Sequence, residues 1–71
     1  MNFGKALKHL KKGRRVARKG WNGKGMYIKL QRSDKFSKMT LSYLYMKTAD
    51  NEIVPFLASQ TDILSSDWEI V

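Results

Sequence analysis

The chain has 71 residues, one histidine, no cysteine and a formal net charge of +8 at pH 7. This length fits one domain with a thin core, and the composition excludes disulfides and a Cys/His zinc site. Because self-association is the remaining way to stabilise so small a domain, we predict a homo-oligomer.

The charge is divided unevenly along the chain. Residues 1–38 contain 13 Lys and Arg and one Asp, a net charge of +12, whereas residues 39–71 contain one Lys and five acidic residues, a net charge of −4. A basic half attracts phosphate groups, whether they belong to a polymer or to a small molecule. No apolar run approaches the roughly 18 residues of a membrane span, and the first residues lack an uninterrupted apolar stretch. We therefore expect a cytosolic protein without a signal peptide.

The first predicted element is an amphipathic helix near the N-terminus. Apolar residues recur there with the spacing of one helical face, at Phe3, Ala6, Leu7 and Leu10. Asn2 is suited to cap the start of the helix, and Gly13 is suited to end it in the left-handed conformation. The stretch covers only about three turns, so it needs a surface on which to pack.

Short strands and turns follow the helix. Alternating residues, or runs of aromatic and branched residues, predict strands at residues 15–18, 26–31, 41–47, 52–54 and 67–71. Residues 32–38 are polar and predict a loop, and Pro55 is predicted to close the strand before it. Residues 59–64 are predicted to form one helical turn with Ser59 or Thr61 as its cap.

These elements predict a single domain over residues 1–71 of the α+β class, with one N-terminal helix packed on a four- to five-stranded, mostly antiparallel sheet. One short helix covers part of only one face of such a sheet. The other face would be wet and partly apolar, which again favours a partner subunit.

The glycine-rich segment at residues 20–25 (GWNGKG) is the most specific local signal. Its glycines allow backbone N–H groups to approach a ligand closely, and the flat face of Trp21 suits stacking on a nucleobase. Arg18, Lys19 and Lys24 flank Trp21 and suit phosphate groups. A tight hairpin turn with Trp21 packed in the core explains the same residues, and composition alone favours that interpretation.

Further polar residues lie nearer the C-terminus. Residues 59–62 (SQTD) can donate to and accept from ribose hydroxyls and base edges, but a capped helical turn with a solvated face explains them equally well. Asp50 is able to hold a ribose, although a turn-forming Asp is the commoner explanation. Trp68, in the last predicted strand, is expected to lie in the core.

Catalysis has little support in the sequence. His9 is the single histidine and is expected to be solvated on the basic helix, so no Ser-His-Asp or Cys-His set can be built. The acidic residues are scattered and lack the spacing of a metal site or of a glycosidase pair. We therefore predict a non-enzymatic protein with no metal and no cofactor.

Two long stretches of the chain resemble one known family. The N-terminal FGKALKHLKKGRRVARKGWNGKGMYIKL and the C-terminal MKTADNEIVPFLASQTDILSSDWEIV are similar to the Thoeris anti-defense 2 family. Its pattern includes Val-x-Arg, Gly-Trp-Asn-Gly-Lys-Gly-Met, a Ser-Gln-x-Asp run and a closing Asp-Trp. The similarity covers nearly the whole chain except residues 32–38.

The resemblance implies a function that composition does not show. Members of this family come from phages and prophages and act as sponges, which hold glycocyclic ADP-ribose, the Thoeris signal, without cleaving it. Some relatives also hold cyclic di- or trinucleotides of the CBASS defence system. Members assemble as homotetramers whose ligand pockets are shared between neighbouring subunits. The resemblance therefore implies a sponge that acts in the cytoplasm of an infected bacterial host.

The resemblance also implies a set of pocket residues. Trp21 would stack on the adenine, while Asn22 and the backbone near Gly23 and Gly25 would line the pocket. Phe56 stands where relatives often carry tryptophan, so stacking there would be weaker. The other implied ligand contacts, some of them from an adjoining subunit, are Arg18, Lys24, Met26, Asp50, Ser59, Gln60, Thr61 and Asp62.

Two other functions stay open. The basic N-terminal half and the aromatic residues Trp21, Tyr27, Tyr43 and Tyr45 favour, as the alternative, a small basic nucleic-acid-binding protein. Binding to a polymer weakens steeply as salt rises, whereas capture of a small ligand depends on salt much less. The third function is a nucleotide-cleaving enzyme, which recovery of intact ligand would exclude.

Overall fold

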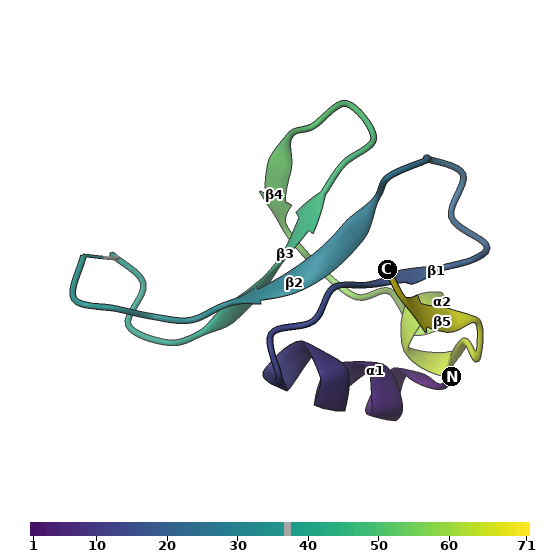
Figure 1. Ribbon diagram of the computed structural model, residues 1–71, viewed down its shortest axis with the longest axis horizontal. Coiled ribbons are helices and arrows are strands. Elements are labelled where there is room, and N and C mark those ends of the chain that lie inside the picture. The colour runs from purple at the N-terminus through teal and green to yellow at the C-terminus, as the bar shows by residue number, and fades with distance from the viewer. Residues whose placement is uncertain (37) are drawn as a thin grey trace.

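The computed structural model describes residues 1–36 and 38–71, which form two helices and a five-stranded sheet. In chain order the elements are α1 (Phe3–Lys11), β1 (Val16–Arg18), β2 (Tyr27–Gln31), β3 (Tyr43–Lys47), β4 (Ile53–Pro55), α2 (Gln60–Leu64) and β5 (Trp68–Ile70). Every neighbouring pair of strands is antiparallel, in the order β4-β3-β2-β1-β5 (Figure 1). The predicted α+β class, with an N-terminal helix on an antiparallel sheet, is confirmed.

Local sequence sets both ends of α1. The side chain of Asn2 accepts a hydrogen bond from the backbone N–H of Lys5 at 2.9 Å, and Gly13 adopts a φ of 86° just beyond the helix. Ala6 and Leu10, on the predicted apolar face, are fully buried. The predicted cap, end and buried face of this helix are therefore confirmed.

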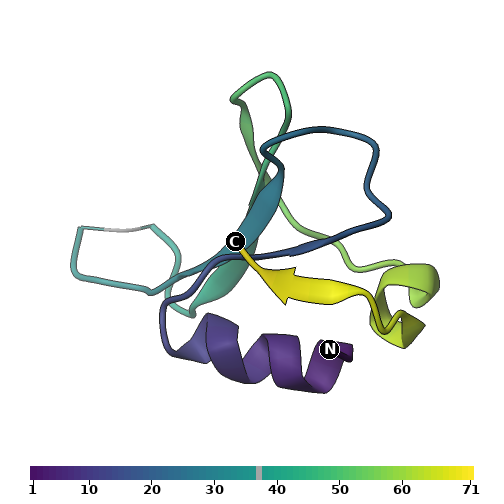
Figure 2. The ribbon, with the colours of Figure 1, turned by 45° about the vertical axis from the view of Figure 1, so that its right-hand side comes forward.

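The core lies between α1 and one face of the sheet (Figure 2). Its buried side chains come from α1, β1, β2 and β5: Ala6, Leu10, Val16, Ile28 and Trp68. Trp68 is only 2% exposed, and the ring of Phe3 packs on it with 5.2 Å between the ring centroids. The prediction that Trp68 lies in the core is confirmed.

The opposite face of the sheet is here called the open face. Because side chains alternate across a strand, the residues next to buried Val16 and Ile28 point to this face. On β2 and β3 it carries Tyr27 opposite Lys47, Lys29 opposite Tyr45, and Gln31 opposite Tyr43. Aromatic rings and cations therefore alternate across these two strands.

Pro55 closes β4 as predicted, but it is itself the last residue of the strand, which therefore extends one residue beyond the predicted end at residue 54. Pro55 pairs with Tyr45 on the neighbouring β3. The sheet order leaves β4 at an edge, where the missing N–H of proline costs no ladder hydrogen bond.

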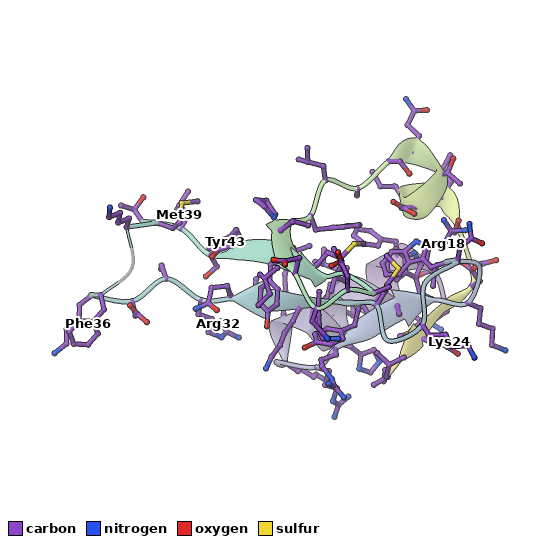
Figure 3. The ribbon with its side chains drawn as sticks, turned by 90° about the horizontal axis from the view of Figure 1, so that it is seen from above. Arg18, Lys24, Arg32, Phe36, Met39 and Tyr43 are labelled. Carbon is purple, nitrogen blue, oxygen red and sulfur yellow. The ribbon has the colours of Figure 1, made fainter. Side chains whose placement is uncertain are left out.

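The connection between β2 and β3 projects away from the rest of the molecule. Figure 3 shows Phe36 and Met39 at one end of the molecule, and Arg18 and Lys24 at the other. The described residues of the predicted 32–38 loop lie outside helices and strands, and residue 37 lies outside the described part of the chain. Within the described residues, neither helix is long and apolar enough to cross a membrane.

Candidate functional site

A pocket of about 620 Å³ lies where the loop between β1 and β2 meets the sheet. Its volume falls within the range of about 300–1,000 Å³ that is usual for small-molecule sites. The loop and the flanks of four strands supply its lining residues, which are Arg15, Ala17, Arg18, Lys19, Trp21, Gly23, Gly25, Met26, Tyr27, Lys47, Glu69 and Val71.

Trp21 lies between the core and the pocket. Its ring is nearly perpendicular to that of Trp68, with 5.4 Å between the centroids and an angle of 80°, and lies 6.3 Å from the ring of Phe56. The side chain is half-buried and also lines the pocket. The two interpretations that the sequence offered, packing and ligand contact, are therefore compatible for this residue.

Arg18 is held by two carboxylates within the chain. Its Nε donates to Asp67 Oδ1 at 2.9 Å and its Nη1 donates to Asp62 Oδ1 at 2.8 Å, and the side chain is 16% exposed. Hydrogen bonds to Asp67 and Asp62 raise the pKa of Arg18 above its ordinary value. Arg18 lines the pocket, but its charge is already compensated there.

Asp67 ties the start of the glycine-rich loop to β5. Besides the bond from Arg18, its Oδ2 accepts the backbone N–H of Gly20 at 2.9 Å. The hydrogen bond from Arg18, followed by that from Gly20, lowers the pKa of Asp67. The sequence analysis did not single out this residue, because its partners are distant in sequence.

Asp62 joins α2 to the loop and to the core. Its Oδ1 also lies 3.4 Å from Trp21 Nε1, and its backbone carbonyl accepts Trp68 Nε1 at 2.9 Å. Burial raises the pKa of Asp62, but hydrogen bonds from Arg18 and Ser59 outweigh burial and leave the pKa below its ordinary value. Of the two predicted caps, Ser59 is the one used, in a reciprocal capping box with Asp62.

The structure brings some of the predicted ligand contacts together and leaves others apart. Four of them line the pocket: Arg18, Trp21, Gly23 and Met26. Asn22 and Lys24 belong to the same loop and are exposed. Asp50 lies in the β3–β4 turn, where it accepts the hydroxyl of Thr48. The others lie at the cap of α2 or on its first turn, outside the pocket lining: Ser59, Gln60, Thr61 and Asp62.

Two glycines fix the shape of the loop. A Cβ atom at Gly23 would collide with the sulfur of Met26 and would crowd Ala49, while Gly25 adopts a φ of 76°. Other side chains at these positions would displace Met26 or strain the backbone. The glycines are therefore required by the course of the loop around the pocket.

Sequence reasoning did not assign to a ligand pocket several residues that strands bring there, above all Arg15, Tyr27 and Lys47. It named Tyr27 only for the nucleic-acid-binding alternative. The Arg15 guanidinium carbon lies 4.8 Å from the centroid of the Tyr27 ring, and Lys47 Nζ lies 5.7 Å from it. Strand alternation places Arg15 and Tyr27 on the same face, but the strand order is needed to make them neighbours.

His9 lies on the basic helix α1 as expected, and its side chain is partly exposed. Its Nδ1 accepts a hydrogen bond from Arg14 Nη1 at 2.8 Å. Burial, together with the charges of Arg14 and Lys12, lowers the pKa of His9. Across residues 1–36 and 38–71, no group of three His, Asp or Glu side chains is placed to hold a metal ion.

Comparison with known proteins agrees with the resemblance found in the sequence. Residues 1–71 match the profile of the Thoeris anti-defense 2-like domain. The chain is also 40% identical, over an alignment 84 positions long, to Thoeris anti-defense 2 of Bacillus phage SP01; the alignment covers all of this chain and 94% of that relative. The chain therefore belongs to the Thoeris anti-defense 2-like family.

Proposed function

We propose that this protein is a phage sponge, which binds and sequesters a cyclic nucleotide immune signal, glycocyclic ADP-ribose first of all, without cleaving it. Family membership supports a phage anti-defense role. The observation that carries the proposal is the pocket itself, whose lining combines the indole of Trp21 with four cationic side chains. A nucleotide offers a base that stacks on an aromatic ring and phosphates that cations attract.

The side chains around the pocket suit capture rather than cleavage. Among the described lining residues, Glu69 is the one acid, and none is histidine, cysteine, serine or threonine. Hydrolysis of a glycosidic bond ordinarily uses a pair of carboxyl groups, and the described lining supplies one carboxylate side chain. The proposed sponge is therefore not an enzyme, and it would leave its captured signal intact.

The proposed assembly is a homotetramer in the cytoplasm of the infected bacterium. Large apolar side chains beside α2 support association, since Leu57 is 90% exposed and Leu64 is 81% exposed. An adjoining subunit would bring the predicted contacts at Asp50 and residues 59–61 to the pocket. The proposed ligand range extends to cyclic di- and trinucleotides of CBASS.

The test is calorimetric titration of the purified protein with glycocyclic ADP-ribose, followed by a panel of cyclic dinucleotides. Saturable, tight binding of one of them supports the sponge. Ligand recovered after heat denaturation of the complex should be chemically unchanged. If no ligand gives a heat of binding, or if a cleaved product is recovered, the proposal is overturned.

A second candidate, nucleic-acid binding, is favoured by the open face. Tyrosines and lysines alternate there, and such a face can stack bases and attract a phosphate backbone. A single-stranded oligonucleotide should then bind with an affinity that falls steeply as salt rises. Binding that survives at about 150 mM salt, roughly physiological ionic strength, would favour this candidate.

A further inference from the structure

The cations that line the pocket differ in what compensates their charge. Arg18 forms two ion pairs, with Asp62 and Asp67. Across residues 1–36 and 38–71, Arg15, Lys19 and Lys47 form no ion pair, although the Glu69 carboxylate lines the same pocket. The pocket therefore holds one compensated guanidinium, that of Arg18, and three cations without a paired carboxylate.

Two of these three unpaired cations, Arg15 and Lys47, lie near one aromatic ring, that of Tyr27. Lys47 is directly opposite Tyr27 in the β2–β3 pair, and the pairing of Val16 with Ile28 makes Arg15 a diagonal neighbour of Tyr27 on the same face. Their charged groups lie 4.8 and 5.7 Å from the ring centroid. These distances fit cation–π contacts, which hold both head groups near the ring.

Two like charges near one ring repel each other, and an anion that both head groups contact would relieve that repulsion. Lys47 Nζ has one protein acceptor in the described residues, the carbonyl of Gly25, at the long distance of 3.5 Å. Donors therefore remain available at both head groups, since an ammonium has three N–H bonds and a guanidinium has five.

We propose that Arg15 and Lys47, arranged around Tyr27, form the anion subsite of this pocket and take the diphosphate of a nucleotide ligand. Arg18 is instead a positioning residue, because its Nε and Nη1 already donate to carboxylates that anchor β5 and α2. This inference rests on the proposed function for the identity of the ligand. Its geometric basis, two unpaired cations on one ring, is independent of that function.

The test uses the full chain and single variants of equal charge change. Arg15→Gln and Lys47→Gln each remove one cation of the subsite, and Lys8→Gln removes one exposed cation from α1, which packs on the other face of the sheet. Calorimetric titration with glycocyclic ADP-ribose should show about a tenfold or greater loss of affinity for the two subsite variants, the usual scale for a lost charge-assisted hydrogen bond. Lys8→Gln should bind like the unmodified protein.

A second probe, inorganic pyrophosphate, tests the subsite without the nucleotide. In NMR titrations of the unmodified protein it should shift the Arg15 side-chain Nε–H and the Tyr27 ring signals and leave the Arg18 Nε–H signal in place. If pyrophosphate gives these shifts but glycocyclic ADP-ribose does not bind, the proposed anion subsite stands and the proposed sponge function is contradicted. Normal ligand binding by both subsite variants, or equal losses in all three variants, would overturn the subsite.

Misfolding of a variant is checked by circular dichroism and by thermal unfolding. If Arg15→Gln does not fold, Lys47→Gln and the pyrophosphate shifts decide the outcome. Arg15→Lys keeps the charge and should retain more affinity than Arg15→Gln.

Discussion

The indole of Trp21 both packs against the core and, in the proposed function, stacks on the base of the ligand. It packs against Trp68 and Phe56, and its Nε1 lies 3.4 Å from Asp62. Stacking on a base would use surface that these contacts leave exposed at the pocket. A rigid aromatic wall costs little conformational entropy when a ligand binds, which favours tight capture.

Trp21→Ala is expected to lower the free energy of unfolding by about 2 kcal/mol, less than the roughly 3–5 kcal/mol for a fully buried tryptophan. The same variant should lose binding of glycocyclic ADP-ribose. Urea denaturation and calorimetry measure the two effects separately. Trp21→Phe, which keeps an aromatic ring, is the control and should retain part of both. Unchanged binding in the alanine variant would remove Trp21 from the ligand site.

The carboxylates around Arg18 predict how stability depends on pH. The pKa values of Asp62 and Asp67 are both lowered in the folded chain from the ordinary value of 3.8. A lowered carboxyl pKa contributes stability that is present above 3.8 and is lost as pH falls through the folded value. Below about pH 4 the melting temperature of the unmodified protein should therefore drop more steeply than that of Asp67→Asn, which lacks one of the two carboxylates. Parallel curves for the two proteins would contradict this role.

At the scale of elements, α2 depends on its cap and on its neighbours. A helix of five residues is too short to be stable alone. Its start is held by the reciprocal bonds between Ser59 and Asp62, and its Asp62 carbonyl is held by Trp68. The helix in turn presents the Asp62 carboxylate to Arg18, so a local capping motif supports one wall of the pocket.

Removing the cap should therefore weaken both α2 and the contact of Asp62 with Arg18 beside the glycine-rich loop. Ser59→Ala is expected to cost about 1 kcal/mol of stability, measured by urea denaturation, as for other helix caps. Ser59→Thr keeps the hydroxyl and should cost less. Equal stability of all three proteins would mean that the capping box contributes nothing measurable.

The elements that local signals define could be predicted from the sequence, and the pairing between distant ones could not. Asn2, Gly13 and the apolar stripe sufficed for α1 because a helix is built from neighbours. The Arg18–Asp67 bond joins residues 49 positions apart, which no local pattern predicts. The Arg15–Tyr27 contact likewise depends on strand order, and the strand role of Pro55 depends on the edge position of β4.

At the scale of the whole molecule, apolar side chains remain at the surface of a chain with only a thin core. Besides Leu57 and Leu64, the most exposed are Phe36 at 85% and Leu41 at 77%. Light scattering at micromolar concentration is expected to give about four times the 8.2 kDa chain mass. A monomer at that concentration would contradict the proposed tetramer and the sharing of a pocket between subunits.

The strand order also bears on how the molecule folds. β2, β3 and β4 pair with strands adjacent in sequence, whereas β5 returns to pair with β1, joining Ile70 to Val16. Long-range closure of this kind is slow, so β5 is expected to dock after the hairpins have formed. Because Glu69 and Val71 complete the pocket wall, the ability to hold a signal would arise at the last folding step. A bound signal would then slow hydrogen exchange most strongly at β5, the strand whose departure opens the pocket.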